Sequence, residues 1–426
     1  MSNWLKVQVY LSALLSMVPF CKPDDRSLKV FMWVPKLVAG ALSPLLGIMA
    51  GLGVALGLVR RDGKLAAAGL LGAGLVARYL RDIPTAEGQF EAAFGPDWAE
   101  RLPEALRARR GPWPARAPQG AQVQRNLVYG QDPGSGKALR ADLWLPGPGT
   151  APSGLGAIYA HGSGWRVGAK DLGTRPFFRR LTNQGHVVLD IDYTLWPEAD
   201  VATMVREVKQ AILWLKENGP AHSVDPGRIV LMGGSAGAHL ALLAAYEPDH
   251  PAFQPAPDAG DTAVCGVVAF YPPVDFLDLT AHREAPVPSA PGVLGRTAEA
   301  MMGRIFMLHA PDVVAAYGAE VDLENSLPAL LGGSPDEIPE TYRLLSPLYH
   351  VGDHCPPTLL LQGSDDVFGL TPGVRRLYAA LQEVGVPSLL VEFPHCDHAF
   401  DLVLPQLSPV AQVATRDVER FLALLA

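Results

Sequence analysis

Arg228-Ile229-Val230-Leu231-Met232-Gly233-Gly234-Ser235-Ala236-Gly237-Ala238-His239-Leu240-Ala241 is the stretch that decides how the rest of the chain is interpreted. The apolar, β-branched run that ends at Met232 predicts a buried strand, and residues 236–246 predict a helix. Little chain remains to turn between them, so Gly233 and Gly237 provide the space that a tight turn around Ser235 needs. This pattern is typical of a nucleophile elbow, which exposes a serine hydroxyl beside a helix N-terminus.

A glycine-rich turn of this kind also occurs by chance, so a catalytic interpretation of the elbow requires an acid and a histidine further along the chain. Asp366 follows the predicted strand 358–362, and His398 follows the predicted strand 388–393. The order serine, aspartate, histidine, each just beyond a strand, predicts a catalytic triad of Ser235, Asp366 and His398. We interpret Asp365 as a turn residue. Three other histidines are interpreted as structural, namely His239, His354 and His395.

A second loop of small residues follows the predicted strand that ends at Ala160. Its sequence is His161-Gly162-Ser163-Gly164-Trp165. Small residues there allow backbone N–H groups to face a developing negative charge, so Gly162, Ser163 and Ala236 are the predicted oxyanion-hole donors. Trp165 is a predicted substrate-binding residue.

The remainder of the chain after residue 117 alternates strands with helices. This alternation predicts an α/β domain over residues 118–426, with a mainly parallel sheet of eight strands flanked by helices. Its predicted strands are 123–129, 139–145, 155–160, 187–192, 228–232, 264–271, 358–362 and 388–393. An irregular insertion at about 275–331 predicts a lid, with Met302 and Phe306 facing the substrate, although an extra core helix fits the pattern equally well.

The front of the chain carries an excess of apolar residues. Residues 37–59 contain no charge, and 23 helical residues reach about 34 Å, so they predict a membrane helix that Pro44 would kink. Residues 65–77 form a shorter apolar run, which leaves a hairpin and a single span both open. We expect lipid contact through residues 37–77 and an interfacial helix over 7–20. A buried helical pair is the alternative.

Three organisational predictions follow. Residues 1–82 are expected to form a membrane-associated helical segment, and the distribution of Lys and Arg favours a cytoplasmic catalytic domain. Residues 83–117 are interpreted as a solvated linker, with a basic, aromatic-bearing segment that contacts anionic headgroups as the alternative. The net charge of −8 argues against nucleic acid as a partner. The four cysteines have no metal-ligand or redox spacing, so we expect free thiols, no metal and no cofactor.

From about Gly156 onward the chain resembles the α/β-hydrolase superfamily, and within it esterases related to hormone-sensitive lipase and to the feruloyl-esterase-like group. The matching residues are 161–165, 192–193, 224–229, 233–241, 332–335, 346–347, Gly363 with Asp366, and 398–400. This resemblance implies carboxylic ester hydrolysis without metal or cofactor. The family usually has glycine where this chain has Ser163. The front end is similar in plan to arylacetamide deacetylase-like and isoprenylcysteine methylesterase-like proteins, without a shared residue motif.

The sequence therefore predicts a serine hydrolase of carboxylesterase type that forms an acyl-enzyme. The expected substrate is a small apolar ester that partitions into membranes. An acyltransferase or an amidase with the same triad, or a non-catalytic lipid-binding scaffold, remain alternatives, and a homo-oligomer is possible.

Overall fold

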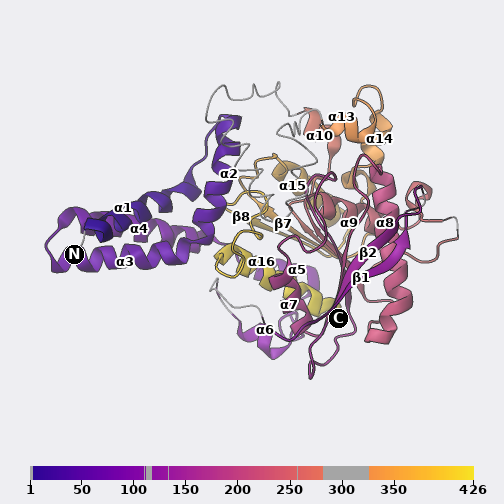
Figure 1. The fold of residues 1–426 in the computed structure, drawn as a ribbon, viewed down its shortest axis with the longest axis horizontal. Coiled ribbons are helices and arrows are strands. Elements are labelled where there is room, and N and C mark those ends of the chain that lie inside the picture. The colour runs from indigo at the N-terminus through magenta and orange to yellow at the C-terminus, as the bar shows by residue number, and fades with distance from the viewer. Residues whose placement is uncertain (1–2, 110, 112–117, 133, 257, 282–325) are drawn as a thin grey trace.

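The computed structural model describes the chain except for residues 1–2, 110, 112–117, 133, 257 and 282–325. An α/β domain forms the larger part of the molecule, and a group of N-terminal helices projects from it (Figure 1). Within the predicted lid, residues 282–325, which include Met302 and Phe306, lie outside the described residues.

One sheet of eight strands forms the centre of the α/β domain. Its order is β1-β2-β4-β3-β5-β6-β7-β8, with β1 and β2 antiparallel to their neighbours and the other strands parallel. The strands are β1 Gln122–Gln131, β2 Ala138–Leu145, β3 Gly156–Ala160, β4 Val187–Ile191, β5 Ile229–Gly234, β6 Gly266–Phe270, β7 Thr358–Gly363 and β8 Ser388–Phe393. The predicted α/β-hydrolase architecture is confirmed, and the parallel strands end at a common edge.

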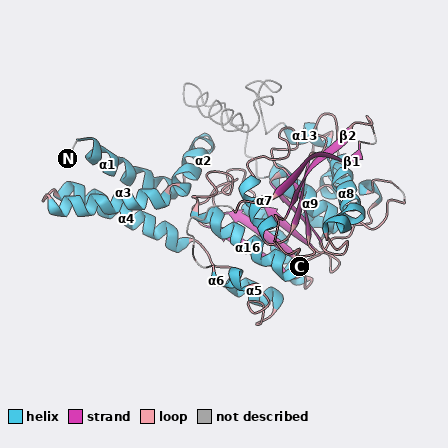
Figure 2. Cartoon of the chain, turned by 60° about the horizontal axis from the view of Figure 1, so that its bottom comes forward, coloured by secondary structure: helices cyan, strands magenta, loops and turns pink. Residues whose placement is uncertain are grey.

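Helices cover both faces of the sheet, as Figure 2 shows. One face packs against α8 (Val201–Asn218), α9 (Ala236–Tyr246) and α15 (Thr371–Glu383). The other packs against α7 (Arg175–Asn183) and α16 (Pro409–Leu425). Shorter helices are α10 Phe276–Ala281, α13 Ser326–Leu331, α14 Pro339–Leu344, and the 3₁₀ turns Val18–Phe20, Gly219–His222, Pro251–Phe253 and Pro347–His350.

The N-terminal helices divide into two groups. Helices α1 (Asn3–Met17), α3 (Ser43–Val59) and α4 (Gly63–Asp82) lie side by side and form what we call the arm (Figures 1 and 2). Helix α2 (Arg26–Ala41) stands at the junction with the α/β domain. Small residues allow α3 and α4 to approach closely, since a methyl group at Gly69 would overlap the α3 backbone.

The prediction of one membrane-crossing helix over residues 37–59 is wrong. The uncharged stretch is broken at Leu42, between α2 and α3, and Pro44 lies in the first turn of α3. Among the described residues, no helix by itself has both the length and the apolar character to cross a bilayer. The segments Leu28–Ala41 and Ser43–Val59 meet those criteria only as a pair, which is bent by 67°.

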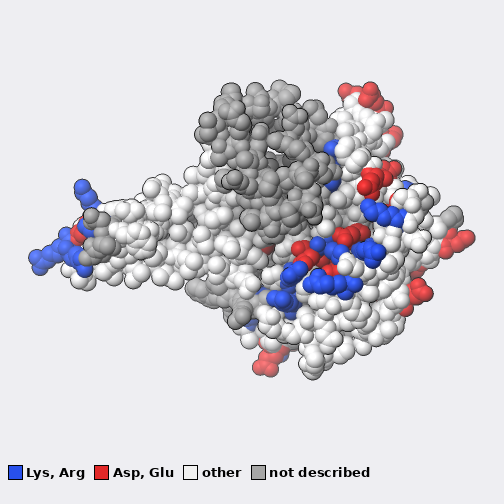
Figure 3. Space-filling view, in the orientation of Figure 1, with Lys and Arg blue, Asp and Glu red and all other residues white. Residues whose placement is uncertain are grey.

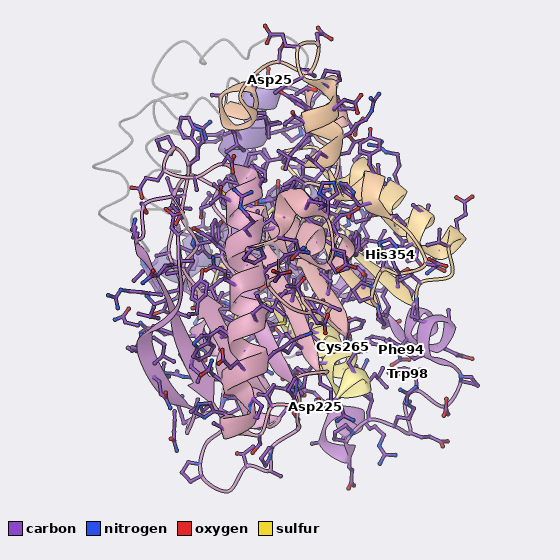
Figure 4. The ribbon with its side chains drawn as sticks, turned by 90° about the vertical axis from the view of Figure 1, so that its right-hand side faces the viewer. Asp25, Phe94, Trp98, Asp225, Cys265 and His354 are labelled. Carbon is purple, nitrogen blue, oxygen red and sulfur yellow. The ribbon has the colours of Figure 1, made fainter. Side chains whose placement is uncertain are left out.

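The segment predicted as a solvated linker, residues 83–117, instead packs on the α/β domain over much of its length. It contains α5 (Glu87–Phe94) and α6 (Glu104–Ala108). Phe90 is fully buried, and Phe94 and Trp98 lie beside α16 (Figure 4), where Phe94 meets the ring of Phe421. Phe90, Phe94 and Trp98 therefore extend the hydrophobic core.

Candidate active site

The elbow between β5 and α9 holds Ser235 in a conformation that L-residues rarely adopt. Its φ is 53° and its ψ is −120°. A methyl group at Gly237 would overlap the carbonyl oxygen of Ala160 on the neighbouring strand, and one at Gly233 would overlap the Gly237 backbone. The two glycines are therefore sterically required, and the serine hydroxyl is presented at the carboxyl end of β5.

The structure brings the three predicted triad residues together. The Nε2 atom of His398 lies 3.0 Å from Ser235 Oγ, and the Nδ1 atom lies 2.9 Å from Asp366 Oδ2. A carboxylate can only accept a hydrogen bond, so Nδ1 carries the proton and the Nε2 lone pair faces the serine hydroxyl. This is the arrangement in which an imidazole can remove the hydroxyl proton.

Asp366 is held by several donors besides the imidazole. Its Oδ2 atom accepts a hydrogen bond from Gln362 Nε2 at 3.0 Å, and its Oδ1 atom accepts one from the Phe368 N–H at 2.9 Å. The side chain is fully buried. These bonds fix the carboxylate in the orientation that meets His398, and they satisfy its buried oxygens.

The predicted oxyanion loop lies against the elbow. A methyl group at Gly162 would come within 3.3 Å of Ser235 Cβ, so the Gly162 backbone borders the nucleophile. The imidazole of His161 binds the Gly162 carbonyl through Nδ1 at 2.9 Å. In a trans peptide the next N–H points away from that carbonyl, so this bond sets the direction of the Ser163 N–H. Ser163 itself has a φ of 87°.

Trp165, a predicted substrate-binding residue, is buried behind the elbow. Its Nε1–H donates to His239 Nδ1 at 3.3 Å, and its ring meets that of Phe276 edge-on. The other nitrogen of His239 binds the Leu345 carbonyl, and burial lowers the pKa of His239 to about 4. His239 is therefore neutral and structural, while a substrate-binding role for Trp165 stays a prediction.

Three aromatic rings that the sequence analysis did not select surround His398. Tyr271 lies 4.4 Å from the imidazole between ring centroids, Phe368 lies 4.7 Å away, and Trp33 lies 6.1 Å away. Tyr271 and Phe368 follow the carboxyl ends of β6 and β7, a position that could have marked them. Nothing in the sequence connects Trp33 of α2 with a histidine so distant along the chain.

A hollow open to solvent adjoins the elbow. This shallow hollow is lined by apolar residues, Phe177, Phe270 and Leu402 among them, and by polar ones that include Arg180, Asp401 and Gln412. Phe270 connects this hollow with the elbow, since its carbonyl accepts the Ser235 N–H, but no triad residue is part of the lining. Burial raises the pKa of Asp401 to about 6, and this carboxyl accepts a hydrogen bond from the Tyr271 hydroxyl.

Two other expectations concern sulfur and metal chemistry. All four cysteines are free thiols, as predicted, and Cys265 and His354 are well separated in Figure 4. Within the described part of the chain, no cluster of three or more His, Cys, Asp or Glu side chains could hold a metal ion.

Comparison with known proteins identifies the family. The BD-FAE family model matches residues 141–371, more than half of the chain, so the chain belongs to this family. Esterase LipQ of Mycobacterium tuberculosis is 27% identical over 76% of this chain and 71% of the relative. The "Probable carboxylic ester hydrolase LipM" of the same organism is 27% identical over 78% and 70%.

Solved structures show the same fold. Esterase Est2 of Thermogutta terrifontis is 22% identical and superposes with a TM-score of 0.51, covering 72% of this chain and 93% of that protein. Together with the relatives, this likeness supports an α/β-hydrolase esterase.

Proposed function

We propose that this member of the BD-FAE family is a serine carboxylesterase that works through an acyl-enzyme on Ser235. The hydrogen-bonded chain from Ser235 through His398 to Asp366 carries the proposal, because it pairs a nucleophile with a base and the base with an orienting carboxylate. The names of the relatives, esterase and carboxylic ester hydrolase, support the same reaction class.

The reaction proceeds in two balanced halves. His398 takes the proton from Ser235 as its oxygen attacks the ester carbonyl, and the N–H groups of Gly162, Ser163 and Ala236 stabilise the resulting oxyanion. The protonated imidazole then gives its proton to the departing alcohol, which leaves an acyl group on the serine. Water, activated by the same histidine, attacks this acyl-enzyme and releases the carboxylic acid.

An apolar ester is the substrate class that the surroundings favour. The rings of Tyr271 and Phe368 lie beside the imidazole of His398, and such surroundings suit an apolar group. A hydrophobic chain held there leaves water, which favours binding by about 0.8 kcal/mol for each buried CH₂ group.

We further propose that the arm binds a lipid bilayer and brings the enzyme to such substrates. Large apolar side chains are exposed on all three of its helices, including Leu14, Ile48 and Leu71, at 62%, 62% and 52%. The tip carries exposed Arg60, Arg61 and Lys64, and Figure 3 shows basic side chains gathered at this end. Apolar sides with a cationic end suit a membrane that contains anionic lipid. The cytoplasmic placement of the catalytic domain stays a prediction from the basic residues.

The enzymatic proposal is tested by pre-steady-state hydrolysis of p-nitrophenyl butyrate. We expect a burst of p-nitrophenol equal to the enzyme concentration, and we expect Ser235→Ala to lose the burst and at least about 10⁴-fold in kcat. Product partitioning between water and added alcohols separates a hydrolase from an acyltransferase. A variant that hydrolyses the ester normally without Ser235 would overturn the proposal.

The membrane proposal is tested by co-flotation with phosphatidylcholine vesicles that contain phosphatidylglycerol. We expect the wild-type chain to float and the double variant Ile48→Glu/Leu71→Glu to remain in the soluble fraction. Val128→Glu, at a residue of β1 that is 49% exposed, is the matched control and should float. Equal flotation of all three proteins, or none for the wild type, would refute lipid binding by the arm.

A further inference from the structure

A lysine from the N-terminal helices lies buried beside the triad. The side chain of Lys36, on α2, is only 4% exposed. Its Nζ atom lies 2.8 Å from Asp365 Oδ2 and 3.9 Å from Asp397 Oδ2. These two aspartates directly precede Asp366 and His398 in the chain. One ammonium group therefore joins the two loops that supply the acid and the base of the triad.

Asp397 adds a second connection between the same loops. Its Oδ1 atom accepts hydrogen bonds from the backbone N–H of Val367 and from that of His398, both at 2.8 Å. The first donor belongs to the loop of Asp366, and the second is the backbone of the catalytic base. The carboxylate is buried, so the charge of Lys36 and these donors are what stabilise it in its ionised form.

The backbone of the histidine is held from α2 at a further point. Trp33 Nε1–H donates to the carbonyl oxygen of His398 at 2.7 Å, and Trp33 is 5% exposed. The Trp33 ring also meets Phe368 edge-on at 5.4 Å, and Phe368 in turn contacts the imidazole. Helix α2 thus contacts the histidine through its backbone and the ring beside it, one turn of helix away from Lys36.

We propose that Lys36 and Trp33 of α2 are positioning residues for ester hydrolysis. They fix the separation and orientation of Asp366 and His398 by holding the two loops together from outside the catalytic domain. Lys36 acts through Asp365 and Asp397, and Trp33 acts through the His398 carbonyl. Small misplacements of a base relative to its nucleophile reduce turnover strongly, so α2 determines how well the triad works.

The role is specific to turnover rather than to binding of the ester. Neither residue lines the hollow that contains Phe177, Phe270 and Leu402. The interaction lost is one that orients the base during proton transfer. Such a change lowers kcat and leaves KM for a small ester nearly unchanged.

The test compares full-length variants by kcat per active site, with sites counted by titration with a fluorophosphonate. This inference rests on the proposed function, so the wild type must first hydrolyse p-nitrophenyl butyrate through Ser235. We expect Lys36→Met to lower kcat per titrated site about tenfold or more, with KM changed less than about twofold. Lys36→Arg keeps the charge and should restore most of the loss. Trp33→Phe removes only the N–H donor and should cost about threefold to tenfold.

Lys22→Met is the matched control. Lys22 also pairs with Asp365, at 2.8 Å, but its side chain is 56% exposed, so its loss should leave kcat within about twofold. If Lys36→Met does not fold, Trp33→Phe decides the question alone. Unchanged kcat per site in these variants, or a fall in titratable sites without a fall in kcat per site, would overturn the inference while leaving the esterase assignment intact. A wild type without serine-dependent hydrolysis would instead overturn the proposed function.

Discussion

The two halves of the candidate triad are held in place by different kinds of interaction. Ser235 stands on an elbow whose geometry is set by backbone sterics, since Gly233 and Gly237 leave no room for a side chain. Asp366 and His398 stand on loops that are joined by polar contacts from Asp397 and from α2. The serine half is thus local and rigid, whereas the histidine half depends on residues that are far away in the sequence.

This difference predicts which property, stability or turnover, a substitution in each half will impair. Crowding the elbow costs folding free energy, because a packed interior cannot move to admit extra atoms. Loosening the histidine loops costs turnover first, because a hydrogen-bonded network tolerates small displacements that catalysis does not. Three substitutions test the comparison, beginning with the largest expected effect.

Gly237→Ala should destabilise the fold by about 3 kcal/mol or more and abolish hydrolysis, because the added methyl overlaps the Ala160 carbonyl. Urea unfolding and the esterase assay measure both effects. Gly74→Ala is the control: it lies in α4 with open space around it, and helix propensity predicts a gain of up to about 1 kcal/mol. A Gly237→Ala protein as stable and active as the wild type would mean that the elbow is not sterically fixed.

Asp397→Asn should change the pH dependence of stability. Burial raises the pKa of Asp397 to about 6. The charge of Lys36 acts in the opposite direction, and the nearby Asp366 adds to the increase. A raised pKa means that the folded state binds the proton more tightly, so stability falls as pH rises from about 4 to about 6. This contribution amounts to about 3 kcal/mol for about two pKa units.

The asparagine variant lacks that titration, so its free energy of unfolding relative to the wild type should rise across the same interval. Its kcat should nevertheless fall, because Lys36 loses one of its two carboxylate partners. Urea unfolding at a series of pH values gives the first quantity. Parallel pH curves for the two proteins would contradict the buried-carboxylate explanation.

Ser163→Gly should have the smallest effect. Ser163 has a φ of 87°, which glycine adopts without strain, so the substitution should stabilise the fold by up to about 1 kcal/mol. The backbone N–H remains, and kcat should stay within about twofold. A large loss of activity would show that the hydroxyl, and not only the backbone, takes part in the reaction.

The sequence predicted the elbow and the sheet well, because those features are encoded locally. Gly233, Ser235 and Gly237 lie within five residues, and the pattern of apolar residues placed the eight strands at nearly their observed ends. The start of α16 is likewise encoded locally, since the Ser408 side chain accepts the Ala411 N–H. In these cases the residues that determine the structure are neighbours along the chain.

The contacts of α2 with the site could not be read in the same way. In the sequence, Lys36 is one basic residue beside an apolar run, and Asp365 is interpreted as a turn residue. The fold instead pairs the two side chains as buried charges. The apolar run itself suggested one long helix, because composition does not reveal a sharp bend at Leu42. His395, interpreted as structural, lies 3.2 Å from Asp82 at the end of the arm.

The break at Leu42 has a practical consequence for any shortened version of this protein. Just before this break, Trp33 and Lys36 of α2 contact the catalytic loops, and the apolar helix α3 begins directly after it. A truncation made to obtain a lipid-free enzyme by discarding the first 82 residues would also discard Trp33 and Lys36. Such a fragment would have a low kcat even on water-soluble esters, and this low kcat would be mistaken for a requirement for lipid.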